Sequence, residues 1–184
     1  MNQVGGYYYL MAQLPGLHPE TPAAITYERF REIALRFLTP DDAKVLSGLS
    51  LEPPRVRLLT GSAVVDGWYD FERSLRLSLE RLRAQKLSRT IALSGDDEAN
   101  IYLALETLPI ARSALSLDDP LEAERYLIRA RADFVERTGA LHYYDADAVF
   151  SYGLMLLLHE RGERFASEAG RASYTTIYHQ ILGE

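Results

Sequence analysis

Apolar residues recur every three or four positions along most of this chain, which is the spacing of amphipathic helices. One helix is expected over 27–38, with Thr26 as its N-cap, and a longer one over 68–87. In the longer helix, Glu72 and Arg76 are spaced for an ion pair on the surface. Its apolar face consists of Trp68, Phe71, Leu75, Leu79 and Leu82.

Other helices are indicated by the residues at their ends. Thr39 before Pro40 predicts a helix start, because threonine can cap and proline suits the first turn. Asp119 before a second proline predicts another start, and Gly139 stands where a left-handed C-cap would end that helix. The apolar face of this helix is Leu121, Leu127, Ile128, Phe134 and Val135.

The next helix starts at Asp145 as its cap, ends at Gly162 and is apolar nearly all round, so we expect it near the centre of the fold. A final helix is expected over 163–182. Another, from about 96 to 107, opens with a capping box at Ser94, and Pro109 should end or kink it.

Residues 7–14 fit either a strand or a short helix, and 47–54 is a loop that contains two prolines. The pattern lacks the alternation of strands and helices that a parallel sheet requires. It therefore predicts an all-α fold of packed helical hairpins or a bundle, with about seven helices in a single domain over 1–184. A break near 48–60 allows a two-lobe organisation.

Composition narrows the classes of function. The 184 residues are 47% hydrophobic and carry a net charge of −6 without a basic stripe, so nucleic acid is not an expected partner. The absence of cysteine excludes disulfides, thiolate metal sites and cysteine nucleophiles. The N-terminus lacks the features of a signal peptide, and the longest apolar run, 153–158, is far below the roughly 20 residues of a membrane helix. We therefore expect a cytoplasmic protein without direct membrane insertion.

His142, Asp145 and Asp147 are the best candidates for catalysis, because a histidine and two carboxylates can bind a divalent cation in a small hydrolase. Their spacing matches no known metal loop, and Asp145 is already expected to cap a helix. The segment 159–165 lacks the second histidine of a zinc protease, and 60–63 lacks the lysine of a phosphate loop. We therefore expect no enzyme and no metal or cofactor site.

Glu124 and Arg131 lie seven residues apart, on the same face as the apolar residues of their helix. Charges on an apolar face destabilise the fold unless they are paired. They pair either with a neighbouring protein or within the chain, with Arg161 or Asp147 as partners. The tyrosines at 7–9 pose the same choice, since tyrosine is enriched at interfaces but also packs with its hydroxyl outward.

Four segments carry a resemblance to a known family: YYYLMAQLPGL from Tyr7, FERSLRLSLERLRAQKL from Phe71, DPLEAERYLIRARADFVE from Asp119 and HYYDADAVFSYGLMLLLHER from His142. They resemble an uncharacterised bacterial family whose genes accompany those of V-type ATPases. That family is similar to the d-type subunit of these rotary enzymes. The resemblance covers most of the chain in the same order and is strongest over 119–168.

The resemblance implies an all-α protein of helical hairpins that works without catalysis. The d-type subunit seats the central stalk of a rotary ATPase on the membrane rotor ring and transmits torque without binding nucleotide. Stalk and rotor-ring subunits are therefore the implied partners, and a cytoplasmic place beside the membrane is the implied location. The chain departs from the family at Gly162, where a tryptophan is frequent, and it is shorter than the d-type subunit, which favours an accessory.

Residues that match the family pattern are Glu124, Arg131, Phe134, Asp145, Asp147, Tyr152, Glu160 and Arg161. The charged ones are candidates for partner contacts or structural ion pairs. Two other interpretations stay open: a helical scaffold for an unrelated protein, and the metal-dependent hydrolase described above.

Overall fold

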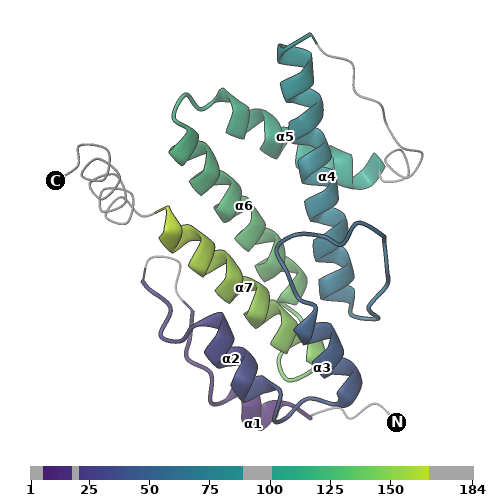
Figure 1. The fold of residues 1–184 in the computed structure, drawn as a ribbon, viewed down its shortest axis with the longest axis vertical. Coiled ribbons are helices and arrows are strands. Elements are labelled where there is room, and N and C mark those ends of the chain that lie inside the picture. Colours follow the sequence, from purple (N-terminus) through teal and green to yellow (C-terminus); the bar gives the residue numbers. More distant parts are fainter. Residues whose placement is uncertain (1–5, 18–20, 89–100, 166–184) are drawn as a thin grey trace, which may run out of the picture.

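The computed structural model describes residues 6–17, 21–88 and 101–165, and every regular element within these ranges is a helix (Figure 1). The helices are α1 (Tyr8–Met11), α2 (Tyr27–Ala34), α3 (Pro40–Ser47), α4 (Ala63–Lys86), α5 (Ile101–Ser116), α6 (Pro120–Gly139) and α7 (Ala146–Arg164). The prediction of an all-α fold with about seven helices is confirmed for this part of the chain. The predicted capping box at Ser94 and the final helix beyond residue 165 lie outside the described residues.

The helix α7 lies at the centre of the fold, as its nearly uniform apolar composition predicts. It forms a hairpin with α6 and also packs against α2, α3 and α4 (Figure 1). Four of its apolar side chains, Phe150, Leu154, Leu156 and Leu158, are fully buried. The helix α5 packs mainly along α4 and also contacts α6. Residues 7–14, which fitted a strand or a helix, contain the short helix α1.

Four predicted N-caps are confirmed. The side chains of Thr26, Thr39, Asp119 and Asp145 each accept a hydrogen bond from a backbone N–H in the first turn of the following helix, at 2.9–3.3 Å. A fifth cap, Ser62, was not predicted. Its hydroxyl accepts from the backbone N–H of Val65 at 3.1 Å, so α4 begins at Ala63 rather than at Trp68.

Three predicted helix ends differ from the structure. The helix expected over 27–38 ends at Ala34. Pro109 does not end α5, which continues to Ser116, because Thr107 and Ala111 on either side of the proline are buried and hold the helix in place. Gly139 is not a left-handed C-cap, since the residue that ends α6 is Ala140 with φ −59°. Gly139 instead lies where α6 meets α7: an added Cβ would be 2.5 Å from the hydroxyl oxygen of Ser151. Close approach, not backbone conformation, explains this glycine.

Aromatic rings fill the contacts between helices. The rings of Phe71 on α4 and Phe134 on α6 are stacked, with centroids 4.1 Å apart. On the other side of α7, Phe30 of α2 packs against Tyr152 and against the backbone at Gly153. A Cβ on Gly153 would lie 3.0 Å from the ring of Phe30, so α2 approaches α7 closely only because this residue is glycine.

Two half-buried tyrosines join α2 and α7 to neighbouring segments. The hydroxyl of Tyr27 donates to the carbonyl of Leu46 at 3.2 Å, and that of Tyr152 donates to the carbonyl of Pro15 at 2.8 Å. Burial disfavours the charged phenolate and raises the pKa of each tyrosine to about 12.

We expect the protein to lose stability as pH rises from about 10 to about 12. A tyrosine in the unfolded chain has a pKa of about 10, so the folded state holds the two protons more tightly than the unfolded state. Their contribution is complete below pH 10 and disappears as the folded-state pKa is passed. Thermal unfolding between pH 8 and 12 should show a smaller decrease in Tm for the variant with Tyr27→Phe and Tyr152→Phe. An equal decrease in Tm for the variant and the wild type would contradict the contribution of these two tyrosines. The control is Tyr9→Phe, which changes an exposed tyrosine.

Candidate protein-interaction surface

A row of ion pairs with a buried centre crosses the fold from α4 to α6. The guanidinium of Arg131 donates from Nε and Nη2 to the two carboxylate oxygens of Glu72, at 2.8 and 3.0 Å. Both residues are buried, with 7% of Arg131 and 1% of Glu72 exposed. Arg76 also donates to Glu72, at 2.8 Å. The predicted pair of Glu72 and Arg76 therefore exists, with Arg76 exposed as expected, but the carboxylate of Glu72 is buried rather than on the surface.

The same row continues to α7 through Glu124. Its carboxylate accepts hydrogen bonds from Nε and Nη2 of Arg161, at 2.8 and 2.6 Å, and lies 4.0 Å from Nη1 of Arg131. Glu124, Arg131 and Arg161 thus pair within the chain. Asp147 takes no part in this row. We call Arg76, Glu72, Arg131, Glu124 and Arg161 the ion row.

Glu72 was missed as the partner of Arg131, although the sequence contains a signal for it. Glu72 follows Trp68 by four residues and precedes Leu79 by seven, so helical periodicity places it on the buried face of α4. The same arithmetic had identified Glu124 and Arg131 as charges on an apolar face. A buried carboxylate on one helix and a buried arginine on another are therefore candidates to pair with each other.

The other predicted residues also join helices to one another. The carboxylate of Glu160 on α7 accepts from the backbone N–H of Tyr27 at 2.7 Å, which places a negative charge at the positive end of α2. Asp147 accepts from the hydroxyl of Ser62, which links the first turns of α7 and α4. Asp145 caps α7 and also contacts the Nδ1 of His142 at 2.6 Å.

The hydrolase interpretation gains no support from these contacts. Among the described residues, no group of three histidine or acidic side chains has the arrangement of a metal site. This includes His142, Asp145 and Asp147. The loop at 60–63 also differs from a phosphate site. The backbone N–H groups of Thr60 and Gly61 donate to the carboxylate of Asp66, at 2.8 and 3.3 Å, so they already bind an anion from the same chain.

Four tyrosines form an exposed aromatic surface at one end of the molecule. Tyr8 and Tyr9 belong to α1, and Tyr143 and Tyr144 to the loop between α6 and α7; between 46% and 74% of each residue is exposed. The ring centroids of Tyr8 and Tyr144 are 4.9 Å apart. Tyr8 also contacts Tyr9, and Tyr143 contacts Tyr144, at 5.6 and 6.5 Å. We call these four residues the tyrosine patch.

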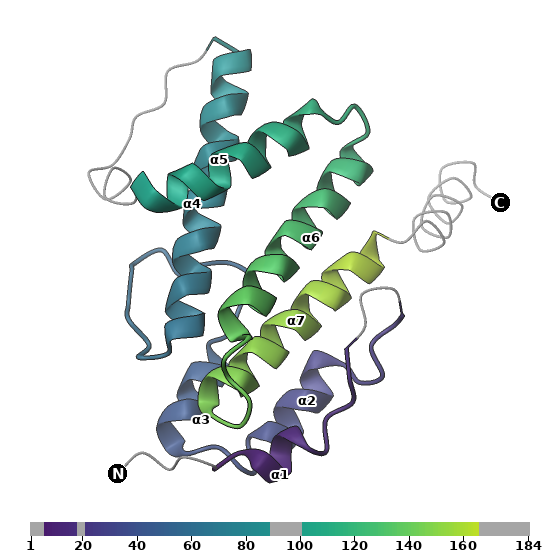
Figure 2. The same ribbon diagram turned by 180° about the vertical axis from the view of Figure 1, so that it is seen from behind.

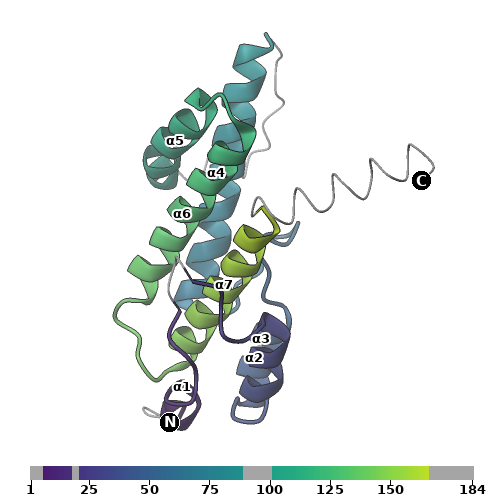
Figure 3. The same ribbon diagram turned by 90° about the vertical axis from the view of Figure 1, so that its left-hand side faces the viewer.

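The tyrosine patch is held in place by Tyr7, which is buried beneath it. The backbone N–H of Tyr7 donates to the carbonyl of Tyr144 at 3.2 Å and joins α1 to the α6–α7 loop. Figures 2 and 3 show these two segments at the same end of the fold. The Tyr7 hydroxyl donates to Asp42 on α3; burial and this carboxylate raise the pKa of Tyr7, so it stays a neutral donor. The patch is therefore fixed to three parts of the chain.

Comparisons with family models, with curated proteins and with solved structures find no match for this chain. Within the described residues, no helix has both the length and the apolar character needed to cross a bilayer. The basis for a functional proposal is therefore the geometry of the described residues.

Proposed function

We propose that this chain is a non-catalytic helical subunit or accessory that binds another protein through the tyrosine patch. The observation that carries the proposal is the exposure of four adjacent tyrosine rings on a well-anchored surface. Tyrosine provides a large contact area and loses little conformational entropy on binding, which explains its enrichment at interfaces. The ion row and Glu160, in contrast, are engaged inside the chain.

The family resemblance supports a V-type ATPase as the assembly. The first of the segments that carry it includes Tyr8 and Tyr9, and the last includes Tyr143 and Tyr144. Segments from the two ends of the resemblance thus contribute the two halves of one surface. As an adaptor similar to the d-type subunit, the chain would hold stalk and rotor-ring subunits through rigid helices and complementary surfaces.

Affinity purification of the tagged protein from its native cell, followed by mass spectrometry, tests the proposed assembly. Recovery of stalk or rotor-ring subunits is the expected result. Recovery of a different protein, from cells that express the ATPase, would replace the adaptor by a scaffold for an unrelated partner. That result would be compatible with protein binding by the patch but would contradict the role in a V-type ATPase.

The patch itself is tested by replacing Tyr9 and Tyr143 with alanine. Interface hot spots contribute about 2 kcal/mol or more, so we expect the affinity for the recovered partner to fall by about 30-fold or more. The matched control replaces Leu105 and Leu87 with alanine. Both are about as exposed as the two tyrosines, but Leu105 lies on α5 and Leu87 directly follows α4. Binding should be measured by biolayer interferometry with the purified partner. Equal affinities for the two double variants would exclude the patch as the interface.

A further inference from the structure

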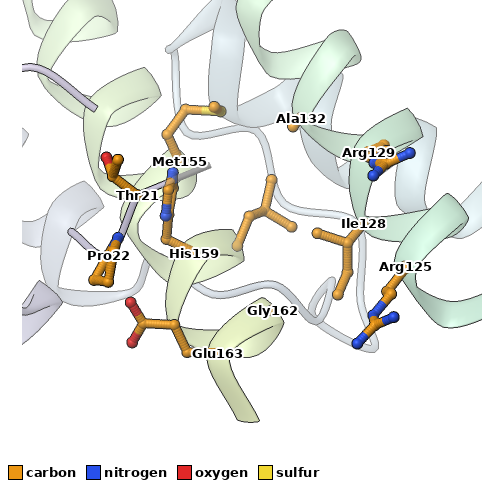
Figure 4. Close-up of a pocket in the computed structure, with 11 residues that line it drawn as sticks. Thr21, Pro22, Arg125, Ile128, Arg129, Ala132, Met155, His159, Gly162 and Glu163 are labelled. Atoms are coloured by element: carbon orange, nitrogen blue, oxygen red, sulfur yellow. The ribbon is translucent and has the colours of Figure 1, made fainter. Parts of the chain in front are cut away.

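A groove runs between α6 and α7 at the end of the hairpin opposite the tyrosine patch. Its volume is about 600 Å³, and it is lined by α6, by the C-terminal half of α7 and by Thr21 and Pro22 of the segment before α2 (Figure 4). Ile128 and Ala132 contribute an apolar surface from α6, and Met155 and Leu158 contribute one from α7. Ile128 is half-buried, although helical periodicity puts it on the apolar face of α6.

The two rims of the groove differ in charge. Arg125 and Arg129 are both exposed and lie four residues apart along the α6 rim, whereas Glu163 lies on the α7 rim together with His159 (Figure 4). The neighbouring charges Glu124, Arg131 and Arg161 are engaged in the ion row. Among the residues that the structure describes, no carboxylate pairs with Arg125 or Arg129. Within the described ranges, two adjacent cations thus lie beside an apolar surface without a carboxylate partner.

We infer that this groove binds an amphipathic helix of a partner protein, with acidic residues on the side of the helix that faces α6. The apolar stripe of such a helix would cover the half-buried side chains of Ile128, Ala132 and Met155, beneath which Leu158 is already buried. Carboxylates four residues apart on that helix match the spacing of Arg125 and Arg129. Glu163 on the opposite rim favours a basic residue on the other flank, so the two rims together determine how the helix is turned about its axis.

This inference goes beyond the proposed function, because it adds a second surface with its own partner chemistry. The tyrosine patch lies at the loop that joins α6 to α7, and the groove lies at the far end of the same two helices. The ion row links α4, α6 and α7 at the level of the groove, where Glu124 and Arg161 are next in sequence to Arg125 and Gly162 of its lining. A rigid hairpin with one binding surface at each end has the geometry that an adaptor between two proteins requires.

The test uses the full chain and two labelled synthetic peptides of about 18 residues, roughly five helical turns. Both carry the same leucine stripe; one has glutamates on the flank expected to face α6 and lysines on the other, and the second has lysines on both flanks. In fluorescence anisotropy at low salt, we expect the glutamate peptide to bind roughly ten-fold more tightly. Arg125→Glu with Arg129→Glu should reverse this preference. Arg36→Glu with Arg55→Glu makes the same change in net charge on other exposed arginines and should leave it unchanged.

Three results would overturn the inference. Equal affinities of the two peptides would show that the rim charges do not select the partner, and absence of binding by both would show that the groove takes no helix. A large decrease in the Tm of the free protein on charge reversal at Arg125 and Arg129 would show that a segment of the same chain occupies the groove. None of these results depends on the tyrosine patch, so the two proposals can fail separately.

Discussion

Replacing Arg131 with alanine is expected to lower the free energy of unfolding by about 3–5 kcal/mol. The substitution leaves the carboxylate of Glu72 inside the core without its bidentate partner. Arg76 still donates to one oxygen of Glu72, but the other oxygen loses its hydrogen bond. A buried charge without a full set of partners is strongly destabilising, because the unfolded chain would return it to water. Urea denaturation followed by circular dichroism measures the effect.

The matched control is Arg137→Ala on the same helix. Arg137 pairs with Glu106 on the surface, and an exposed pair contributes about 1 kcal/mol or less. The double substitution Glu72→Leu with Arg131→Met removes both charges and fills their space, so it should be less destabilising than Arg131→Ala alone. If the double variant is as unstable as Arg131→Ala, the pair stabilises the fold through its packing rather than through its charges.

Replacing Trp68 with alanine should also lower the free energy of unfolding by about 3–5 kcal/mol. Trp68 is fully buried on α4 beside Phe71, and no smaller side chain can fill its place. Its indole N–H donates to the carbonyl of Ser50 at 3.1 Å, so the substitution also frees the loop that joins α3 to α4. Because Trp68 is the only tryptophan of the chain, its fluorescence cannot report on the variant, and circular dichroism is the appropriate measurement.

The variant Trp68→Phe separates the two contributions of this side chain. It retains an aromatic ring but leaves the carbonyl of Ser50 without its donor, and we expect it to cost roughly 1–3 kcal/mol. Leu59→Ala, in the same loop but exposed, should change the stability by no more than about 0.5 kcal/mol. A cost for Trp68→Ala near that of Leu59→Ala would contradict the burial of the indole.

Features that depend on neighbouring residues could be predicted from the sequence. The caps at Thr26, Thr39, Asp119 and Asp145 require a side chain and a backbone N–H within three residues, and all four are present. The apolar α7 also appears where its composition indicated. Helix ends were less predictable where tertiary contacts decide them: the burial of Thr107 and Ala111 carries α5 through Pro109.

Partners far apart in the chain could be predicted only in part. Helical periodicity placed Glu124 and Arg131 on a buried face, but it could not show that Arg131 meets Glu72. The tyrosines at 7–9 and at 143–144 each stood out, yet their contact depends on the packing of α1 against the α6–α7 loop. The groove had no signal in the sequence, because its two rims come from different helices whose relative position is a property of the fold.

The hydrogen bond from Tyr27 to Glu160 spans 133 residues of chain, and this separation affects how the protein is made. At about 5–20 residues per second, a ribosome needs roughly 7 to 27 s to advance from one residue to the other. During that interval α2 and α3 exist without α7, the helix against which they pack. Phe30 and Leu46, buried in the finished fold, have no α7 to cover them until that helix emerges from the ribosome. We therefore expect apolar side chains of α2 and α3 to stay exposed to solvent during translation until α7 has been made.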